Sequence, residues 1–265
     1  MPRFTQEDRL IAAISRRSGS SEKLSKLQKI WNDNALESAR ALVSEGIYTP
    51  DELAKDEKWV AAEQLRRDQG NNPEEKEYPE KVDATLAIMK LFDMDQTEQE
   101  LMVTPIHDRD KLKAGIRFLL TENGRTIGIN IDTVLDERGE KAVANSIAKA
   151  IHEGEIEKLS TSNLKYIEDE DIRGQLVPKM NFILRRDRAS KLADLVAEGD
   201  PNGLNNEEKA AKDEIKLEMQ IQIKRYIKGF DDLIELSKLG KGLDQAKLAK
   251  IKEIKAKLEA FKELF

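Results

Sequence analysis

The pattern around His152 is the part of this sequence that comes nearest to a catalytic motif. His107 and His152 are the only histidines in the chain, and Glu153 follows His152 directly. A zinc protease needs His-Glu-x-x-His, because histidines at this spacing lie on one face of a helix and share a metal ion. The second histidine position holds Ile156. His152 and Glu153 are therefore candidate catalytic residues, although we expect no metal and no cofactor. The competing interpretation places His152 at the C-terminal end of a helix, where the partial negative charge favours it.

A strand-like pattern, Ile-Asn-Ile-Asp at 129–132, precedes the amphipathic pattern that ends at His152 and Glu153. With these features residues 121–154, about an eighth of the chain, resemble the zincin-like segment that precedes the toxin domains of bacterial polymorphic toxins and filamentous haemagglutinins. In that segment a strand with Ile-Asn leads to a helix carrying Gly-His-Glu-x-x-His. The present chain lacks the second histidine and has Ala-Ile at 150–151 in place of the glycine context. The resemblance implies a bacterial protein, secreted or delivered between bacteria, whose metal chemistry is lost and in which both candidate residues are vestigial.

A short basic cluster lies in the second half of the chain. It consists of Arg185, Arg186, Arg188 and Lys191. Such a cluster can contact phosphate groups, as in a nucleic-acid accessory protein. Aromatic residues are not interleaved with it as they are in RNA-binding motifs, and a charged outer helix face is the simpler interpretation. We therefore expect that nucleic acid is not a partner.

Other catalytic and nucleotide-binding motifs are missing from the sequence. It contains no phosphate-binding loop, no Gly-x-Gly-x-x-Gly after a strand and no Gly-x-Ser-x-Gly. The run that begins at Asp93 lacks the glycine and the glutamate that a calcium-binding EF-hand loop requires. Acidic residues are too frequent to nominate a glycosidase pair. These absences favour a protein that is not an enzyme.

Composition and charge indicate a soluble chain with a highly charged surface. Charged residues make up 36% of the sequence, and 45 cations against 51 anions give a net charge of -6. Both signs are interleaved, so the whole chain has no attraction to nucleic acid. The absence of cysteine excludes disulfides and thiolate ligands, and no apolar run reaches the roughly 18 residues of a membrane span. We expect a cytoplasmic protein, with secretion or delivery by a route without a signal peptide as the alternative.

The first 70 residues have the apolar periodicity of a helical region. The Ser-Gly-Ser-Ser run at 18–21 is expected to end one helix, and Gly46 is expected to end the next. Thr49 and Pro50 predict a further helix start, with threonine as the N-cap and proline at the first helical position. A polar linker that contains proline is expected at 71–80.

A β-hairpin is the clearest prediction in the middle of the chain. Asn123 and Gly124 separate two runs of alternating apolar residues, and both residues tolerate the positive φ of a tight turn. The predicted register places three apolar pairs on one face: Leu120 with Ile127, Phe118 with Ile129, and Ile116 with Ile131. The hairpin spans about 115–132. A helix at about 139–153 is expected to cover it, and residues 102–106 are the candidate third strand.

The C-terminal part is expected to be helical. Pro178 predicts the start of a helix that bears Phe182 and Leu184. Residues 204–265 predict a helical hairpin or coiled-coil-like tail. Its last helix carries apolar residues at coiled-coil-like spacing: Ile251, Ile254, Leu258, Phe261 and Phe265. We expect this stripe to be the partner-binding surface, either for another protein or for self-association.

The expected fold class is α+β, predominantly α-helical. Its expected regions are an N-terminal helical region (1–70), a central α+β region (81–200) and the C-terminal hairpin (204–265). The favoured function is non-catalytic protein–protein interaction, as in an adaptor, a scaffold or an inhibitor-like protein, because amphipathic helices bind grooves and other helices. The alternatives are a toxin-associated bacterial protein with a degenerate zincin-like segment and a nucleic-acid accessory protein with a short basic helix.

Overall fold

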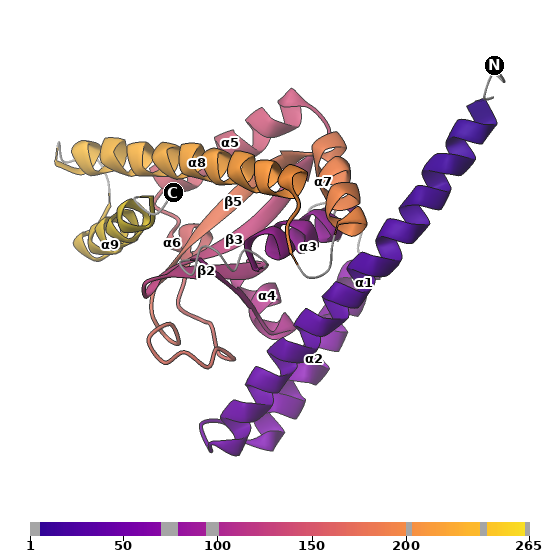
Figure 1. Ribbon diagram of the computed structural model, residues 1–265. Helices are drawn as coiled ribbons and strands as arrows, with labels where there is room; N and C mark the ends of the chain where they lie inside the picture. The colour runs from indigo at the N-terminus through magenta and orange to yellow at the C-terminus, as the bar shows by residue number, and fades with distance from the viewer. Residues whose placement is uncertain (1–5, 70–78, 94–100, 200–202, 239–242, 263–265) are drawn as a thin grey trace.

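A five-stranded mixed sheet lies at the centre of the computed structural model (Figure 1). The structure describes residues 6–69, 79–93, 101–199, 203–238 and 243–262. The strands follow the spatial order β1-β2-β3-β5-β4. Strands β3 and β5 are parallel, and the other neighbouring pairs are antiparallel. Their bounds are β1 (Met102–Pro105), β2 (Phe118–Glu122), β3 (Arg125–Val134), β4 (Ser160–Thr161) and β5 (Val177–Arg185).

Nine helices surround this sheet within the described ranges, which confirms a predominantly helical α+β fold. They are α1 (Gln6–Ser44), α2 (Pro50–Gln69), α3 (Pro79–Asp93), α4 (Asp108–Ala114), α5 (Glu137–His152), α6 (Ile156–Leu159), α7 (Arg186–Glu198), α8 (Asn206–Lys238) and α9 (Gln245–Lys262). Helix α5 lies in the connection between the parallel strands β3 and β5. Parallel strands need such a long crossover, whereas antiparallel strands can be joined by a short turn. None of the described helices combines the length and the apolar character that a membrane span requires.

The predicted hairpin is confirmed, except at one residue. Asn123 and Gly124 both have positive φ, at 49° and 75°, and Glu122 pairs with Arg125. Phe118 and Leu120 face their predicted partners, and β1 is the third strand. Ile116 was placed on the same face, but it precedes β2 and packs in a separate cluster with α4 and the segment 164–177. Ile116 lies in the short connection between the end of α4 at Ala114 and the start of β2 at Phe118, so it is not paired with β3 as a strand residue.

Two other local predictions are wrong. Helix α1 continues through 18–21 without a break, because glycine inside a helix costs only about 1 kcal/mol relative to alanine. The segment after Pro178 forms β5 and not a helix, and the next helix begins at Arg186. Phe182 and Leu184 are buried together on β5 and alternate with half-buried residues, as in a strand. The helix start at Thr49 is confirmed, since Thr49 and Glu52 form a reciprocal capping box.

The three predicted regions share one hydrophobic core. Its largest cluster includes Leu24 and Trp31 of α1, alternate residues of β2, β3 and β5, and Ile251 of α9. Helices α3, α5, α7 and α8 also contribute to it. Most of the predicted 71–80 linker lies outside the described residues, and α3 begins at Pro79. The sheet is therefore stabilised by helices from both ends of the chain.

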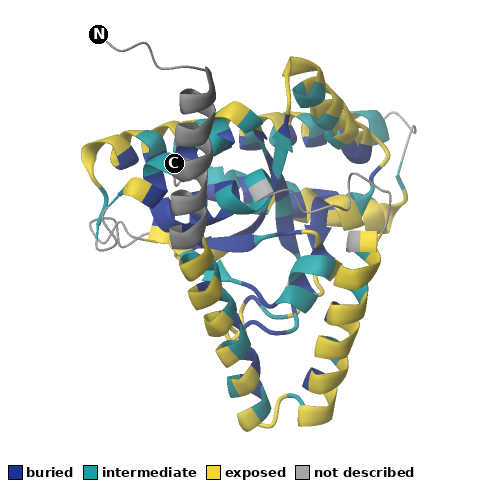
Figure 2. Cartoon of the chain, turned by 90° about the vertical axis from the view of Figure 1, so that its right-hand side faces the viewer, coloured by how far each residue is buried: buried dark blue, intermediate teal, exposed yellow. Residues whose placement is uncertain are grey.

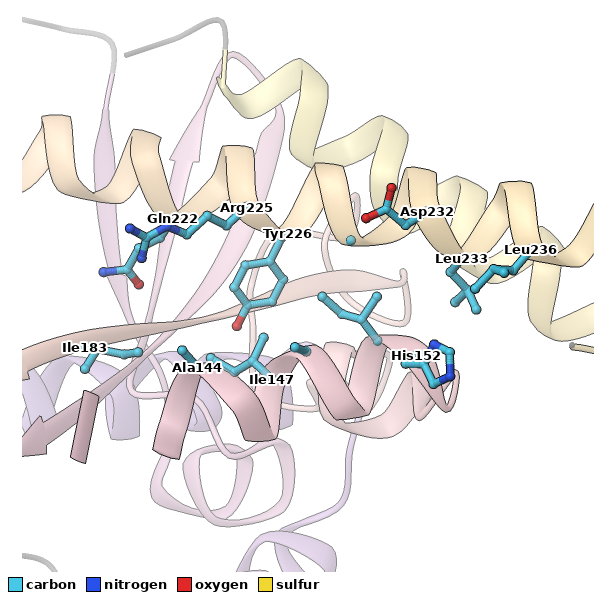
Figure 3. A pocket seen from close by; sticks show the side chains of 13 residues that line it. Ala144, Ile147, His152, Ile183, Gln222, Arg225, Tyr226, Asp232, Leu233 and Leu236 are labelled. Atoms are coloured by element: carbon cyan, nitrogen blue, oxygen red, sulfur yellow. The ribbon is translucent and has the colours of Figure 1, made fainter. Parts of the chain in front are cut away.

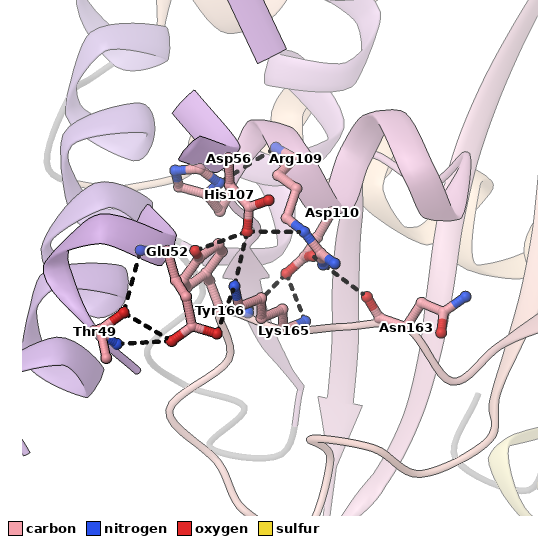
Figure 4. Close-up of polar contacts among 9 residues, drawn as sticks. All are labelled: Thr49, Glu52, Asp56, His107, Arg109, Asp110, Asn163, Lys165 and Tyr166. Carbon is pink, nitrogen blue, oxygen red and sulfur yellow. Dashed lines mark hydrogen bonds and ion pairs between the residues drawn. The ribbon is translucent and has the colours of Figure 1, made fainter. Parts of the chain in front are cut away.

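The α1–α2 hairpin extends from the body (Figure 2), and a polar cluster holds it there (Figure 4). Asp110 of α4 is fully buried, and its carboxylate accepts the backbone N–H groups of Lys165 and Tyr166 at 2.9 and 2.8 Å. Asp56 of α2 accepts from the Lys165 ammonium at 2.8 Å and from the Tyr166 hydroxyl at 2.9 Å. Burial raises the pKa of Asp56, but these two hydrogen bonds and the charges of Lys165 and Arg109 together hold that pKa below its ordinary value. Arg109 also forms ion pairs with both carboxylates. The charged groups of the cluster therefore neutralise one another, and their contacts position α2 against α4.

Candidate functional site

Two capped helices, α5 and α8, form the walls of the candidate site. The side chain of Asp136 accepts a hydrogen bond from the backbone N–H of Gly139 at 2.9 Å and so caps α5. Asn205 and Glu208 cap α8 reciprocally, each side chain accepting the backbone N–H of the other residue at 2.9 Å. These caps set where each helix begins, and therefore which of its faces meets the other.

Helix α5 has an apolar face that the rest of the chain covers only in part. Ala150 and Ile151, in its last turn, are buried. Ile147 is half-buried, while Ala144 and Ala148 are exposed. The predicted covering role of this helix is thus fulfilled at its C-terminal end, and the middle of its apolar face stays open. An amphipathic helix in a folded domain normally buries this face, so the open part of α5 is an exposed apolar surface.

The open face of α5 lines an apolar groove of about 370 Å³, seen from close by in Figure 3. Helix α8 forms the other wall, and one residue of β5 also contributes. The lining is mostly apolar, with polar side chains at the edges. The lining residues are Ala144, Ile147, Ala148, Ile151, His152, Ile183, Gln222, Arg225, Tyr226, Gly229, Asp232, Leu233 and Leu236.

Small residues allow the two helices to approach at one end of the groove. A methyl group added to Gly229 would lie 3.2 Å from Ile151 Cδ1, which is tighter than ordinary van der Waals contact. The short side chains of Ala144 and Ala148 leave space in the middle of the groove, on the side formed by α5. The groove therefore exists because α5 and α8 meet at Gly229 and leave unfilled space beside Ala144 and Ala148.

The polar groups of the groove lie apart from one another. The hydroxyl of Tyr226 accepts the backbone N–H of Asn181 at 3.2 Å, and burial raises the pKa of this tyrosine well above its ordinary value. Gln222 and Arg225 lie at one end of the groove, and His152 lies at the other (Figure 3). Among the described residues, no hydrogen bond joins two of these side chains as a general acid and a general base would be joined. The arrangement is suited to binding an apolar surface and orienting it by its ends.

His152 and Glu153 are both exposed at the end of α5. Glu153 pairs with Lys149 at 3.7 Å on the outer face. Within the described residues, no group of three or more histidine, aspartate or glutamate side chains could hold a metal ion. His152 does contribute to the groove, but a catalytic role for it and the resemblance to the zincin-like segment stay predictions.

The C-terminal apolar stripe is not a surface in this structure. Ile251, Ile254, Leu258 and Phe261 are all buried, none more than 1% exposed. They belong to the largest core cluster, and α9 contacts β3, β5 and α8. The prediction that they bind a partner is corrected for these four residues, because the chain's own sheet and α8 already cover the stripe. Phe265 lies outside the described residues.

The basic cluster lies around the start of α7, where acidic residues accompany it. Arg185 pairs with Glu140 at 3.7 Å, and Arg188 pairs with Glu214 and Glu218 of α8. Lys191 is exposed on the same helix. Three carboxylates beside two of the arginines reduce the attraction to phosphate, which favours the interpretation as a charged helix face. Nucleic-acid binding stays an untested alternative.

His152, which lines the groove, was named from the sequence as a candidate catalytic residue and not as part of a groove. The missed residues of α8 do carry a signal, since Gln222, Tyr226, Gly229 and Leu233 follow one another at three or four positions, the spacing of a helix face. That signal identifies a face but not its neighbour, so the pairing of α8 with α5 needed the tertiary structure. No family model, no curated protein and no solved structure matches this chain.

Proposed function

We propose that this protein is a protein–protein interaction module that binds an apolar helix of another protein in the groove between α5 and α8. The observation that carries the proposal is the open apolar face of α5, where Ala144 and Ala148 are exposed beside a groove of about 370 Å³. Helix-in-groove recognition uses such a site, in which the partner inserts apolar side chains at intervals of three or four residues. A solvent-exposed apolar groove lowers its free energy when it is covered.

Exposed apolar residues extend the same surface along α8. Leu217 is 58% exposed and Ile221 is 40% exposed. They precede Arg225 at intervals of four residues, so the three side chains follow one side of the helix. A partner helix that enters the groove beside Arg225 can therefore continue over Ile221 and Leu217. The charged and amide groups at the groove ends then determine its direction, because a carboxylate on the partner is favoured near Arg225.

Site-specific photo-crosslinking tests this proposal in cells of the source organism. A photoreactive phenylalanine derivative at position 144 lies in the groove, whereas the same group at position 142 lies on another side of the same exposed helix. We expect a defined protein to be crosslinked from position 144 and not from position 142. The absence of any crosslink specific to position 144 would contradict the proposal.

A matched pair of substitutions then measures the contribution of the groove. In Ala144→Arg a charged side chain occupies the groove, and we expect the affinity for the crosslinked protein to fall at least tenfold, about 1.4 kcal/mol. Ala142→Arg introduces the same side chain outside the groove, and its affinity should stay within about twofold. The unfolding midpoint of both variants is the control for folding. Equal affinities for the two variants would place the partner elsewhere.

A further inference from the structure

A second cavity, of about 310 Å³, lies among α1, α2, α3 and α4. Its lining comes from the first half of the chain, whereas the groove is lined by the second half. One part of its wall gathers side chains that donate hydrogen bonds. These are Gln28, Asn32, Gln64, Arg67, Lys111 and Arg117. They come from three helices and the segment after α4, so only the tertiary structure brings them together.

The charge of this wall is positive. Among the described residues, its lining includes three cationic side chains and one carboxylate, that of Asp108. Lys111 pairs with Asp108 at 2.9 Å, and Arg67 pairs at 2.9 Å with Glu63, which also binds Arg66. Glu63 and Arg66 lie outside the lining, so the described lining itself has more cations than carboxylates.

The environment of Arg117 affects its charge. Burial is the main cause that lowers the pKa of its guanidinium, to about 10, and the nearby Arg67 acts in the same direction while Asp132 opposes it. The side chain therefore stays charged at neutral pH. An anion in the cavity interacts favourably with both arginines that line it.

Apolar side chains also line the cavity. Trp31 of α1 lines it together with Val82, Leu86 and Met89 of α3. The indole of Trp31 is otherwise enclosed, with 8% of the residue exposed. An aromatic wall beside cationic donors is suited to a molecule with a ring at one end and an anionic group at the other.

We propose that this cavity binds a small organic phosphate monoester, with the phosphate toward Arg67, Lys111 and Arg117 and a ring-sized apolar body against Trp31. A phosphate monoester carries nearly two negative charges at neutral pH, so the three lining cations attract it, and its oxygens accept several hydrogen bonds at once. The site is independent of the α5–α8 groove, because the two cavities share no lining residue.

Tryptophan fluorescence provides the test, since the chain has only two tryptophans. In a Trp59→Phe background Trp31 is the remaining one, and we expect phenyl phosphate to change its emission saturably at low salt. Phenol, which has the ring without the phosphate, should give no saturable change at the same concentration, and benzoate should bind at least fivefold more weakly. A response to phenol or benzoate equal to that of phenyl phosphate would overturn the proposal, as would no response to phenyl phosphate.

Substitutions at neighbouring arginines locate the binding. Arg67→Gln removes a lining cation and should weaken phenyl phosphate binding at least tenfold. Arg66→Gln removes a cation that pairs with the same Glu63 but does not line the cavity, and it should leave binding within twofold. Lys111→Gln is the second lining variant, measured in case Arg67→Gln lowers the unfolding midpoint. Equal binding by the lining and the control variants would overturn the assignment.

Discussion

At the scale of single residues, buried polar groups determine how distant segments meet. Asp110 joins α4 to the backbone of Lys165 and Tyr166, although 55 and 56 positions separate them in the sequence. Such a carboxylate is stable inside a protein only because donors surround it. His107 belongs to the same region, since its ring lies 4.7 Å from that of Tyr166.

His107 should make the stability of the protein depend on pH between about 5 and 7. Its Nδ1 accepts the backbone N–H of Arg109 at 3.2 Å and caps α4, which requires an unprotonated nitrogen. Burial lowers the pKa of His107, although Asp110 and Asp108 oppose this effect. The unfolded chain therefore binds a proton near the ordinary pKa of 6.5 while the folded chain does not, so the free energy of unfolding should fall as pH decreases through that value.

The replacement His107→Asn tests this pH dependence, because asparagine also caps helices but does not titrate. We expect urea denaturation of the wild-type protein to show a larger loss of stability from pH 7 to pH 5 than the variant shows. His152→Asn replaces the other, exposed histidine and should behave like the wild-type protein. An equal pH dependence of all three proteins would show that His107 is not the titrating group.

At the scale of secondary-structure elements, each amphipathic stripe needs a surface to cover it. The stripe of α9 meets the sheet and α8, so its apolar residues stabilise the fold. The stripe of α5 is covered only near its C-terminal end. The same kind of pattern thus contributes to the core in one helix and lines an exposed groove in the other.

Truncation of the α9 stripe should therefore destabilise the protein without changing its association. Ile254 is fully buried, and Ile254→Ala should lower the free energy of unfolding by about 2–5 kcal/mol through lost burial and a cavity. Lys250→Ala, at an exposed position of the same helix, should change it by less than about 0.5 kcal/mol. Urea denaturation measures both, and the molar mass in solution is the second readout. A changed mass with unchanged stability would indicate an interaction surface after all.

At the scale of the whole molecule, a buried ion pair joins three helices. The ammonium of Lys90 in α3 donates to the carbonyl of Val196 in α7 at 3.0 Å and pairs with Glu208 of α8 at 3.4 Å. Both charged side chains are almost completely buried, at 4% and 0% exposed. Glu208 also caps α8 together with Asn205. One carboxylate thus sets the start of α8 and its position against the other two helices.

Neutralising Glu208 should be costly, because it leaves the ammonium of Lys90 buried without its counter-charge. We expect Glu208→Gln to lower the free energy of unfolding by about 3–5 kcal/mol. Glu207→Gln changes the neighbouring exposed residue and should alter stability by less than about 0.5 kcal/mol. Guanidinium denaturation separates the two variants, and similar midpoints would mean that the pair does not hold these helices together.

Local patterns were sufficient to predict the hairpin, the start of α2 and the C-terminal helices. The turn at Asn123 and Gly124 is determined by backbone sterics, and the facing of Leu120 and Ile127 follows from strand alternation. Both causes act within a few residues, so they are visible in the sequence. His152 was named for a different reason, its likeness to a metal-binding motif, and its place in the groove was not predicted.

The remaining features were decided by contacts between distant segments. The segment after Pro178 became a strand because β3 provides a parallel partner for it, and its apolar residues alone did not distinguish a buried strand from a helix. The apolar stripe of α9 is part of the hydrophobic core because the sheet and α8 cover it. The groove and the cationic cavity each combine residues from several elements, and only packing brings such residues together. The sequence by itself determined the elements and their apolar faces, while the tertiary structure decided which faces were covered, because burial depends on neighbours that are far away along the chain.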